Sequence, residues 1–349
     1  MAEHGLVITA YNEAKSGWRQ RESEPGGKPC GAFSYEDDLS EKHEGNELLA
    51  TLDSVRANSD AVHIVVVDDG STDGCVDRAG EFGAVVVKHR KRHGIGWSRT
   101  EGVAALPGGC DTVMFLDAHQ RISPGCVENG AEIALERDAI VMPDCRGLRD
   151  RPRYTKLKPG QTQETATQHR ILPRTTAHKN ETGWMFRNSL SYDKPEDDVC
   201  RSHALNSPGY TVPIGVWADM PISSLCRGFG GNEAMLWVKA FFLDVPILHT
   251  CKSMVRHLFR SHNAHYKATP LEVNRNMAVL AKTCFDAKTW GKFWWPMVFE
   301  GNVTRNTEKM LGCDQLWNEH VEFQAKKKRP DREFWLGLCS EPLPVEGIE

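Results

Sequence analysis

Short apolar runs and amphipathic stretches alternate along the first 140 residues of the chain. Runs of β-forming apolar residues bounded by polar ones predict strands at 5–10, 63–67, 84–88, 112–116 and 139–142. Between them, apolar residues with a period of about 3.6 predict helices near 48–55, 96–106 and 127–137. Strands that alternate with helices are typical of a doubly wound α/β sheet, which we therefore predict.

Two long segments interrupt this alternation. Residues 15–46 are rich in Gly, Glu, Ser and Lys, and residues 146–213 carry many Arg, Thr and Pro residues with little periodicity. Long irregular segments inside a compact domain are usually functional loops or disordered ones. For residues 15–46, an acceptor-side lid and a passive insertion both stay open.

Further helices are predicted in the last third of the chain, near 234–243 and 271–285. An aromatic stretch and a charged tail follow them, the aromatic residues being Trp290, Phe293, Trp294 and Trp295. We therefore expect a mainly helical C-terminal extension over 286–349.

The composition excludes several classes of protein. A net charge of −4 gives no bulk attraction to nucleic acid or anionic membranes, and no apolar run is long enough to span a bilayer. The 11 cysteines are spread singly without a C-x-x-C pair, which favours reduced thiols over disulfides or a zinc site. We therefore expect a cytoplasmic protein without a membrane segment (in the host cytoplasm for a viral chain). A structural zinc site around His257, His262 and His265 stays open as an alternative.

An acid and a histidine follow the strand predicted at 112–116. Asp117 and His119 lie two positions apart, and residues at i and i+2 on extended backbone point to the same side. The carboxyl end of such a strand is where open α/β sheets bind ligands. One carboxylate and one imidazole suit Mn²⁺ or another divalent ion that also holds a diphosphate. Taken alone, the pattern also fits a strand end without a function.

Polar motifs follow the first two strands as well. The first strand continues into Thr9-Ala10-Tyr11-Asn12-Glu13-Ala14, and the second ends in Asp68-Asp69-Gly70-Ser71. Acids at a strand end accept hydrogen bonds from a ribose or a base. Turn formation and helix capping are the alternative, and they explain at most two of Asp68, Asp69 and Asp73. The chain lacks the Walker phosphate loop and the G-x-G-x-x-G fingerprint, so NTP hydrolysis and ordinary dehydrogenase chemistry lose support.

Two more motifs complete a resemblance to a known family. Gly228-Phe229-Gly230-Gly231-Asn232-Glu233 and Val255-Arg256-His257-Leu258-Phe259-Arg260 follow the others along the chain. In their order and spacing, the motifs resemble nucleotide-sugar glycosyltransferases of the GT-A fold. Within that fold they are most similar to the polypeptide N-acetylgalactosaminyltransferases. The resemblance covers about 5–140 and 225–290, including the basic loop and helix at 89–105.

The resemblance implies a fold and a set of ligands. It implies a GT-A Rossmann-like mixed sheet flanked by helices, in a catalytic domain over 1–285 followed by the extension at 286–349. Residues 1–140 would form the nucleotide-sugar half and 141–285 the acceptor and metal half. Asp117, His119 and His257 would bind Mn²⁺ (or Mg²⁺), with a UDP-sugar as donor. For His257, a satisfied core histidine is the alternative.

The donor contacts implied by the resemblance come from four regions. Asp68 or Asp69 would bind the nucleoside, and Arg92 and Arg99 would meet phosphate charge or form a solvated basic face. The base and ribose would be lined by residues that follow the first strand, namely Thr9, Tyr11, Asn12 and Glu13. Gly230 and Gly231 would lie against the donor.

The glycine-rich motif Gly228–Glu233, called the glycine loop below, departs from the family pattern in one respect. The family has Gly-Gly-Glu-Asn, whereas this chain has Asn232 before Glu233. We take Glu233, Asn232 and Asp117 as candidate catalytic residues. Glu233 begins a predicted helix, and it would either contact sugar hydroxyls or act as the acceptor base. A base opposite the leaving group gives inversion, while a departing phosphate that deprotonates the acceptor gives retention. The resemblance favours retention.

The acceptor is the least determined part of the prediction. The family modifies protein hydroxyls in a secretory compartment, from enzymes with a membrane anchor and a lectin domain, neither of which is recognisable here. Trp294 and Trp295 with the basic run 326–329 suit stacking and phosphate contact on nucleic acid, although a core-packed aromatic helix and a solvated tail is the favoured interpretation of these residues. Among cytosolic acceptors, hydroxymethylated bases of viral DNA are the first single prediction. A protein, a cytosolic glycan and a lipid-linked acceptor are alternatives, as is an inactive sugar-nucleotide binding module. A sugar-1-phosphate nucleotidyltransferase loses support because its N-terminal glycine-rich motif is absent.

Overall fold

The structure is a computed structural model. It describes residues 3–14, 39–40, 42–59, 62–148, 166–172, 185–191, 199–202, 204–205, 209–258, 269–296 and 305–338. Most of the segment proposed as a lid, the end of the Val-x-His-x-Phe-Arg motif, and His262 and His265 of the alternative zinc site lie outside these residues.

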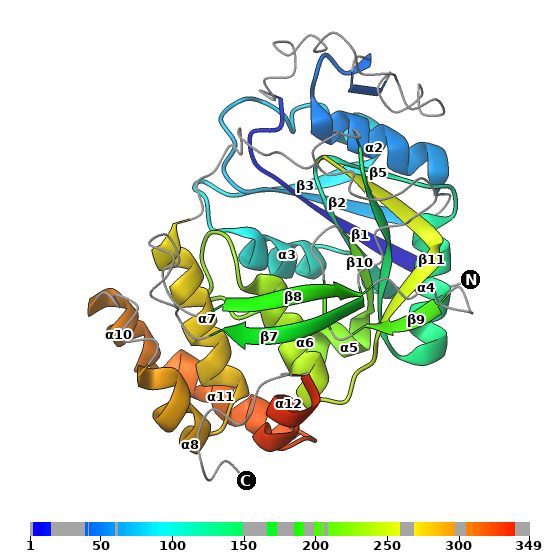
Figure 1. The fold of residues 1–349 in the computed structure, drawn as a ribbon. Helices are drawn as coiled ribbons and strands as arrows, with labels where there is room; N and C mark the ends of the chain where they lie inside the picture. Colours follow the sequence, from blue (N-terminus) through cyan, green and yellow to red (C-terminus); the bar gives the residue numbers. More distant parts are fainter. Residues whose placement is uncertain are drawn as a thin grey trace, which may run out of the picture.

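A mixed sheet runs through the molecule (Figure 1). Its strands are β1 (Glu3–Ala10), β2 (Val62–Asp68), β3 (Ala84–Lys88), β4 (Cys110–Asp117), β5 (Gln120–Ile122), β6 (Ile140–Gly147), β9 (Val199–Ser202), β10 (Tyr210–Pro213) and β11 (Ile247–His257). Their order is β3-β2-β1-β4-β10-β6-β11-β5, with β9 also paired to β11. The β3-β2-β1-β4 half is parallel, while β10 runs antiparallel to both β4 and β6. A separate hairpin joins β7 (Ala166–Leu172) to β8 (Met185–Ser191).

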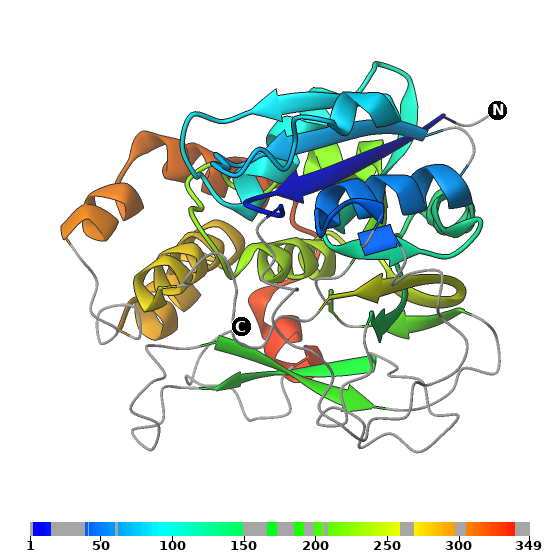
Figure 2. The same ribbon diagram turned by 90° about the horizontal axis from the view of Figure 1, so that it is seen from above.

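Helices cover both faces of the sheet because successive side chains of a buried strand point to opposite sides. In β1, Leu6 and Ile8 pack with α2 (Glu47–Asn58) and α4 (Cys126–Arg137). Val7 points to the other face, which is covered by α3 (Ile95–Ala104), α5 (Ile214–Asp219) and α6 (Asn232–Phe242). Figure 2 shows the same layers from above.

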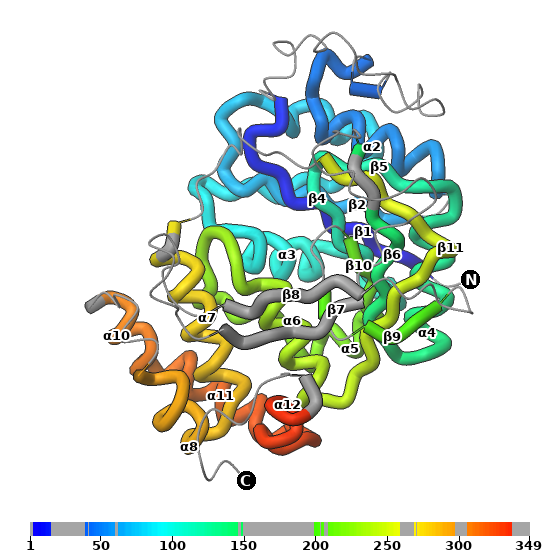
Figure 3. Tube along the Cα trace, viewed as in Figure 1, coloured from blue at the N-terminus to red at the C-terminus, as the bar shows by residue number. Residues whose placement is uncertain are grey.

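The remaining helices form the C-terminal part of the molecule. They are α7 (Pro270–Cys284), α8 (Ala287–Thr289), the π-helical turn η3 (Trp290–Trp294), α10 (Arg305–Leu311), α11 (Asp314–Lys326) and α12 (Asp331–Leu338). A short 3₁₀ turn, η2 (Ala79–Phe82), lies between β2 and β3 in the first half of the chain. In the tube view of Figure 3, α10, α11 and α12 gather at the end of the molecule opposite α2. Among the described residues, none of the helices is long and apolar enough to cross a membrane.

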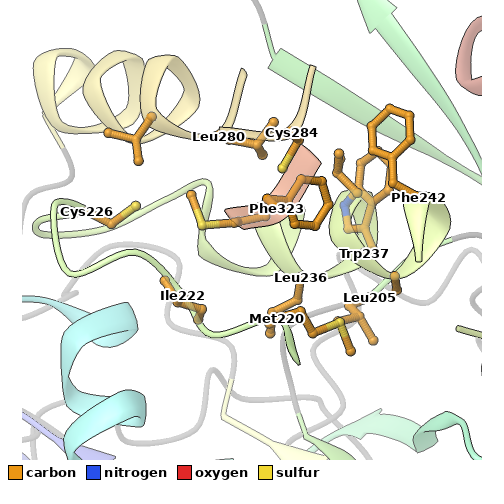
Figure 4. Close-up of a cluster of buried hydrophobic side chains, with 14 of the residues drawn as sticks. Leu205, Met220, Ile222, Cys226, Leu236, Trp237, Phe242, Leu280, Cys284 and Phe323 are labelled. Carbon is orange, nitrogen blue, oxygen red and sulfur yellow. The ribbon is translucent and has the colours of Figure 1, made fainter. Parts of the chain in front are cut away.

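One hydrophobic cluster joins this helical part to the sheet. It extends from Val7 of β1 through α6 and α7 to Trp335 of α12. Figure 4 shows part of it, with Trp237 and Phe242 of α6 close to Cys284 of α7 and Phe323 of α11. The predicted division at residue 285 therefore falls inside a continuous core.

The predicted α/β fold is confirmed, and every strand and helix predicted in the first 140 residues is present. The expectation of little regular structure over 146–213 is wrong for the described part, because β7, β8, β9 and β10 lie there. Strand β10 is only four residues long but is buried between β4 and β6. So short an element has too few alternating positions for its periodicity to be recognised.

Candidate functional site

Asp117, His119 and His257 meet at the carboxyl end of β4. Strand β4 ends at Asp117, a tight turn holds His119, and β5 begins at Gln120. His257 at the end of β11 lies opposite Gln120 in an antiparallel pair, and the N–H of Leu258 donates to the carbonyl of His119 at 3.1 Å. The pairing of β5 with β11 therefore places His257 next to His119, although 138 positions separate them in the chain.

The predicted reason for the convergence of Asp117 and His119 is wrong in one detail. His119 is on the turn after β4 rather than on extended backbone, so strand alternation does not align the two side chains. The turn is needed because the chain reverses there to enter β5. The short strand β5 then pairs with β11.

The three side chains form a donor set that fits a divalent metal ion. One ligand atom from each lies within 4.8 Å of the others, and all three residues are partly buried. Asp117 Oδ2 is 3.3 Å from His257 Nε2, and the two imidazole centroids are 4.8 Å apart. A carboxylate and two imidazoles suit Mn²⁺ and other first-row ions, with positions left over for a substrate. This is the one such cluster within the described ranges.

The charge of Asp117 is stabilised by its neighbours. Burial by itself would raise its pKa, but the hydrogen bond and charge of His257, together with Arg99 and His119, hold the pKa at about 2. Asp117 is therefore a carboxylate at neutral pH. This is the protonation state that a metal ligand requires.

A buried arginine links Asp117 to the glycine loop. Arg99, on α3, is 1% exposed; its Nη1 donates to Glu233 Oε1 at 2.6 Å, and its Nη2 is 3.6 Å from Asp117 Oδ1. Burial opposes the guanidinium charge, but Tyr210, Glu233 and Asp117 raise the pKa of Arg99. The sequence predicted a phosphate contact for Arg99. In the structure its charge faces two carboxylates of the site.

A buried polar network holds the turn that carries His119. Gln120 Oε1 accepts from the N–H of Asp117 at 3.2 Å, and the N–H of Gln120 donates to Thr51 Oγ1 at 3.1 Å. The next residue, Arg121, pairs with Glu47 Oε2 at 2.7 Å, and both side chains are fully buried. This anchoring role was not predicted from the sequence. The signal for it was the pair of polar residues directly after the Asp-x-His motif, in a segment that the structure buries.

Asp68 and Asp69, the two acids after β2, have different hydrogen-bond partners. Asp68 Oδ1 accepts from the N–H of Ser71, which is the turn role that the sequence left open. Asp69 binds the basic loop instead: its carboxylate accepts from the N–H groups of His93 and Gly94 at 2.7 and 2.8 Å and lies 2.9 Å from His89 Nδ1. Both oxygens of Asp69 are thus engaged by the protein, so Asp68 is the better candidate for a nucleoside contact.

The segment after β1 lies beside these acids. Thr9 is opposite Asp117 in the parallel β1–β4 pair and is partly buried. Asn12 has φ +56°, and its Oδ1 accepts from the N–H of Thr72 at 2.8 Å, so its amide joins two loops of the site. The Tyr11 ring is partly buried with the Arg92 guanidinium 5.9 Å from its centroid, and Arg92 is also 4.0 Å from Glu272.

The basic loop and the glycine loop cross in van der Waals contact. A Cβ on Gly94 would lie 2.3 Å from the backbone of Gly228, and the N–H of Gly228 donates to the carbonyl of His93. The buried Asn276 of α7 then holds the glycine loop, because its amide donates to the carbonyls of Arg227 and Gly230 at 2.8 Å. Sequence analysis did not identify Asn276, which lies in the middle of an amphipathic helix.

The glycine loop ends at the start of α6. Gly230 and Gly231 have φ of +90° and +76°, and Gly231 is the N-cap. Asn232 is 1% exposed, and neither atom of its amide has a hydrogen-bond partner among the described residues. The Glu233 side chain is 18% exposed and faces Arg99. Of the two predicted catalytic residues in this loop, Glu233 is the more accessible.

The features that favoured a nucleic-acid acceptor are mostly used for packing. Trp294 is fully buried with its ring 5.0 Å from Phe285, so the predicted stacking role is wrong for this residue. The burial follows from its place in the aromatic core, which is the favoured interpretation of the sequence. Three of the four basic residues that follow pair with acids of the protein: Lys326 with Asp219, Lys327 with Asp331 and Arg329 with Asp244. Trp295 and Lys328 are exposed.

Comparison with known proteins agrees with this fold. Residues 42–193 match the family model "Glycosyl transferase family 2". A solved structure of GalNAc-T7 with UDP, GalNAc and Mn²⁺ superimposes with a TM-score of 0.63 at 13% identity, over 96% of this chain and 57% of that one. The chain thus spans little more than half the length of that structure. No curated protein sequence matches the chain.

A second similar structure is TarS 1–349 of S. aureus in complex with UDP-GlcNAc. It is 13% identical and aligns over 97% of this chain and 76% of that one, with a TM-score of 0.46. The family model and the GalNAc-T7 fold agree with the resemblance found in the sequence. The chain accordingly has the GT-A fold, which it shares with GalNAc-T7, and its residues 42–193 match a glycosyltransferase family model.

Proposed function

We propose that this protein is a glycosyltransferase that moves a sugar from a UDP-linked donor to a hydroxyl acceptor, with a divalent metal ion and with retention of anomeric configuration. The observation that carries the proposal is the convergence of Asp117, His119 and His257 at the carboxyl edge of β4. The GalNAc-T7 structure, whose fold this chain shares, holds UDP, GalNAc and Mn²⁺.

Asp117, His119 and His257 would hold the metal, which we take to be Mn²⁺ with Mg²⁺ as the alternative. When bound, the ion stabilises the leaving diphosphate as negative charge develops on it. The protein supplies an ionised carboxylate at Asp117 and two partly buried imidazoles. Asp117 acts in catalysis through this role.

The remaining donor contacts follow from the positions of the side chains. Asp68 would accept hydrogen bonds from the nucleoside, and the Tyr11 ring would lie against the base or ribose. Arg92, partly buried beside Tyr11, would meet phosphate charge. Gly230 and Gly231 expose backbone at the start of α6, where the donor sugar would lie.

Retention is supported by the environment of Glu233. One of its oxygens is bound to the buried Arg99 at 2.6 Å, which fixes the carboxylate in place. A carboxylate held in this way is well suited to accept hydrogen bonds from sugar hydroxyls. In the retaining reaction, the acceptor oxygen bonds to the anomeric carbon as the bond to phosphate breaks. The acceptor proton passes to the departing phosphate, so no protein base is required.

The acceptor carries a hydroxyl group, and hydroxymethylated DNA stays the predicted example. Of the residues that favoured DNA, Trp295 and Lys328 are the exposed ones. Protein, glycan and lipid-linked hydroxyls belong in the same screen. Transfer of radiolabelled sugar to each acceptor class, with donor hydrolysis in water as the reference, identifies the class.

The first experiment measures thermal stability with and without Mn²⁺ across UDP-, GDP- and CDP-sugars. A ligand at 100 times its dissociation constant adds about 2.7 kcal/mol to the free energy of unfolding. We expect a metal-dependent rise in Tm with UDP-sugars. A folded protein that shows no shift with any nucleotide sugar would contradict the proposal and would favour a chain without donor binding.

A further inference from the structure

Glu13 lies against a proposed metal ligand rather than at the surface of the site. Its carboxylate is buried, with Oε1 3.4 Å from Nδ1 of His119. That ring nitrogen is itself shielded from solvent and has no hydrogen-bond partner among the described residues, so its contact with Glu13 is an ion-pair distance. The sequence had placed Glu13 in the lining of the base and ribose. The structure turns its carboxylate toward the imidazole.

The backbone around Glu13 is held on both sides. Its carbonyl accepts from the N–H of Glu47 at the start of α2, at 3.2 Å. The N–H of the next residue, Ala14, donates to Asp73 Oδ2 at 2.8 Å. The carboxylate is therefore presented from a segment fixed to α2 and to the loop after β2.

The turn that carries His119 is held through its backbone, but these contacts do not orient the imidazole ring. Asp117 is the last residue of β4 and faces Arg99 and His257, while His257 is the last residue of β11. His119 is on a turn, where backbone pairing does not set the ring orientation. A side-chain partner is needed to keep one ring nitrogen directed at the ion.

We propose that Glu13 is a positioning residue that orients His119 for metal binding. A metal-ligating histidine commonly donates its second N–H to a carboxylate, which sets the tautomer and the ring orientation. With Nδ1–H directed at Glu13, the Nε2 lone pair is the one available to the ion. The inference rests on the proposed function, because it assigns a role within the same metal site.

The test is direct Mn²⁺ binding, measured by electron paramagnetic resonance of the free ion without donor or acceptor. Glu13→Gln keeps the size of the side chain and removes its charge. We expect this variant to bind Mn²⁺ at least about 10-fold more weakly than the wild type. Glu101→Gln, at an exposed acid on α3, removes the same charge elsewhere and should bind Mn²⁺ like the wild type.

Three outcomes separate the inference from the proposed function. If the wild type binds Mn²⁺ and Glu13→Gln binds it equally well, the positioning role is overturned while the metal site stands. If Glu13→Gln weakens UDP binding alone, Glu13 contacts the nucleoside, and the inference is again overturned. If neither the wild type nor His119→Ala binds Mn²⁺, both the metal site and the inference fail.

A second measurement needs no variant at Glu13. Nitrogen-15 NMR of histidine-labelled wild-type protein, with His119→Ala used for assignment, reports which ring nitrogen carries the proton. We expect the Nδ1–H tautomer for His119. An Nε2–H tautomer in the Mn²⁺-free protein would overturn the proposal.

Discussion

At the residue scale, Asp117 connects the parts of the site. One of its oxygens faces His257 at 3.3 Å and the other faces Arg99 at 3.6 Å, and Arg99 in turn binds Glu233. The metal side and the sugar side of the proposed reaction therefore share one chain of charged groups. Substitution of His257 should therefore affect metal binding, whereas substitution of Arg99 should affect the stability of the fold.

His257→Ala should abolish metal-dependent donor hydrolysis while the protein stays folded. The variant removes one of three proposed ligands from a partly buried position, so the loss of metal affinity should exceed about 100-fold. Hydrolysis of UDP-sugar at saturating Mn²⁺ and circular dichroism measure the two effects. His63→Ala, at a half-exposed histidine paired with Glu3, is the control and should keep full activity. Full activity in His257→Ala would remove this residue from the site.

Arg99→Met should lower the free energy of unfolding by about 3–5 kcal/mol, because it leaves the Glu233 and Asp117 carboxylates without their buried cation. Arg99→Met combined with Glu233→Gln should recover part of this loss, since the amide needs no counter-charge. Urea denaturation of Arg99→Met, of Glu233→Gln and of the double variant measures the coupling. Additive losses in the double variant would show that Arg99 and Glu233 do not interact.

At the element scale, strand pairing and loop crossing assemble the site. Strand β11 pairs with β9 through Ile247–Thr250 and, beyond an irregularity, with β5 through Val255–His257. Because β11 pairs first with β9 and then with β5, His257 lies beside the turn that follows β4. The contact between Gly94 and Gly228 brings the basic loop and the glycine loop together in the same way.

Gly94→Ala should weaken donor binding and destabilise the protein. Gly94 has φ +107°, which alone costs a non-glycine residue about 1–3 kcal/mol, and the added Cβ would push the backbone of Gly228 away. The glycine loop should then lose its position relative to Arg92. Thermal unfolding and UDP-sugar titration measure both effects. Gly80→Ala, with nothing within 4 Å of its added Cβ, is the control, and an equal effect there would contradict the loop-crossing argument.

At the scale of the whole molecule, the C-terminal helices share the core of the catalytic part. The cluster that contains Val7 of β1 also contains Phe285, Trp294 and Trp335. The division of the chain at residue 285 stays a prediction. A continuous core implies that stability and activity are linked across it.

Trp294→Ala should cost about 3–5 kcal/mol of stability and should lower Tm without a specific effect on nucleic-acid binding, because Trp294 is fully buried beside Phe285 and Trp335. Trp295→Ala is the matched control, since the neighbouring ring is 38% exposed and should cost much less. Chemical denaturation and a DNA-binding titration compare the two. A larger loss of stability in Trp295→Ala would contradict the packing described for η3.

Much of the fold follows from local patterns. The strands and helices of the first 140 residues are short apolar or amphipathic segments. Their apolar positions indicate the type of element and its buried face, so the sequence alone predicted these elements. The candidate metal ligands were identified from motifs that resemble a family, because Asp117 and His257 occur in short stretches with distinctive neighbours. The resemblance did not assign Glu13 or Arg99 the contacts that they make.

The sequence by itself determined the class of fold, the glycosyltransferase resemblance and the candidate ligands. Tertiary structure decided which polar residues work together: Arg99 with Glu233, Glu13 with His119, Asn276 with the glycine loop. It also decided that Trp294 is core and that the turn after β4, not strand alternation, brings His119 to Asp117. The physical reason is that the spacing of apolar residues along the chain indicates only whether a side chain is buried. The partner of a buried charge is set by contacts between segments far apart in the chain.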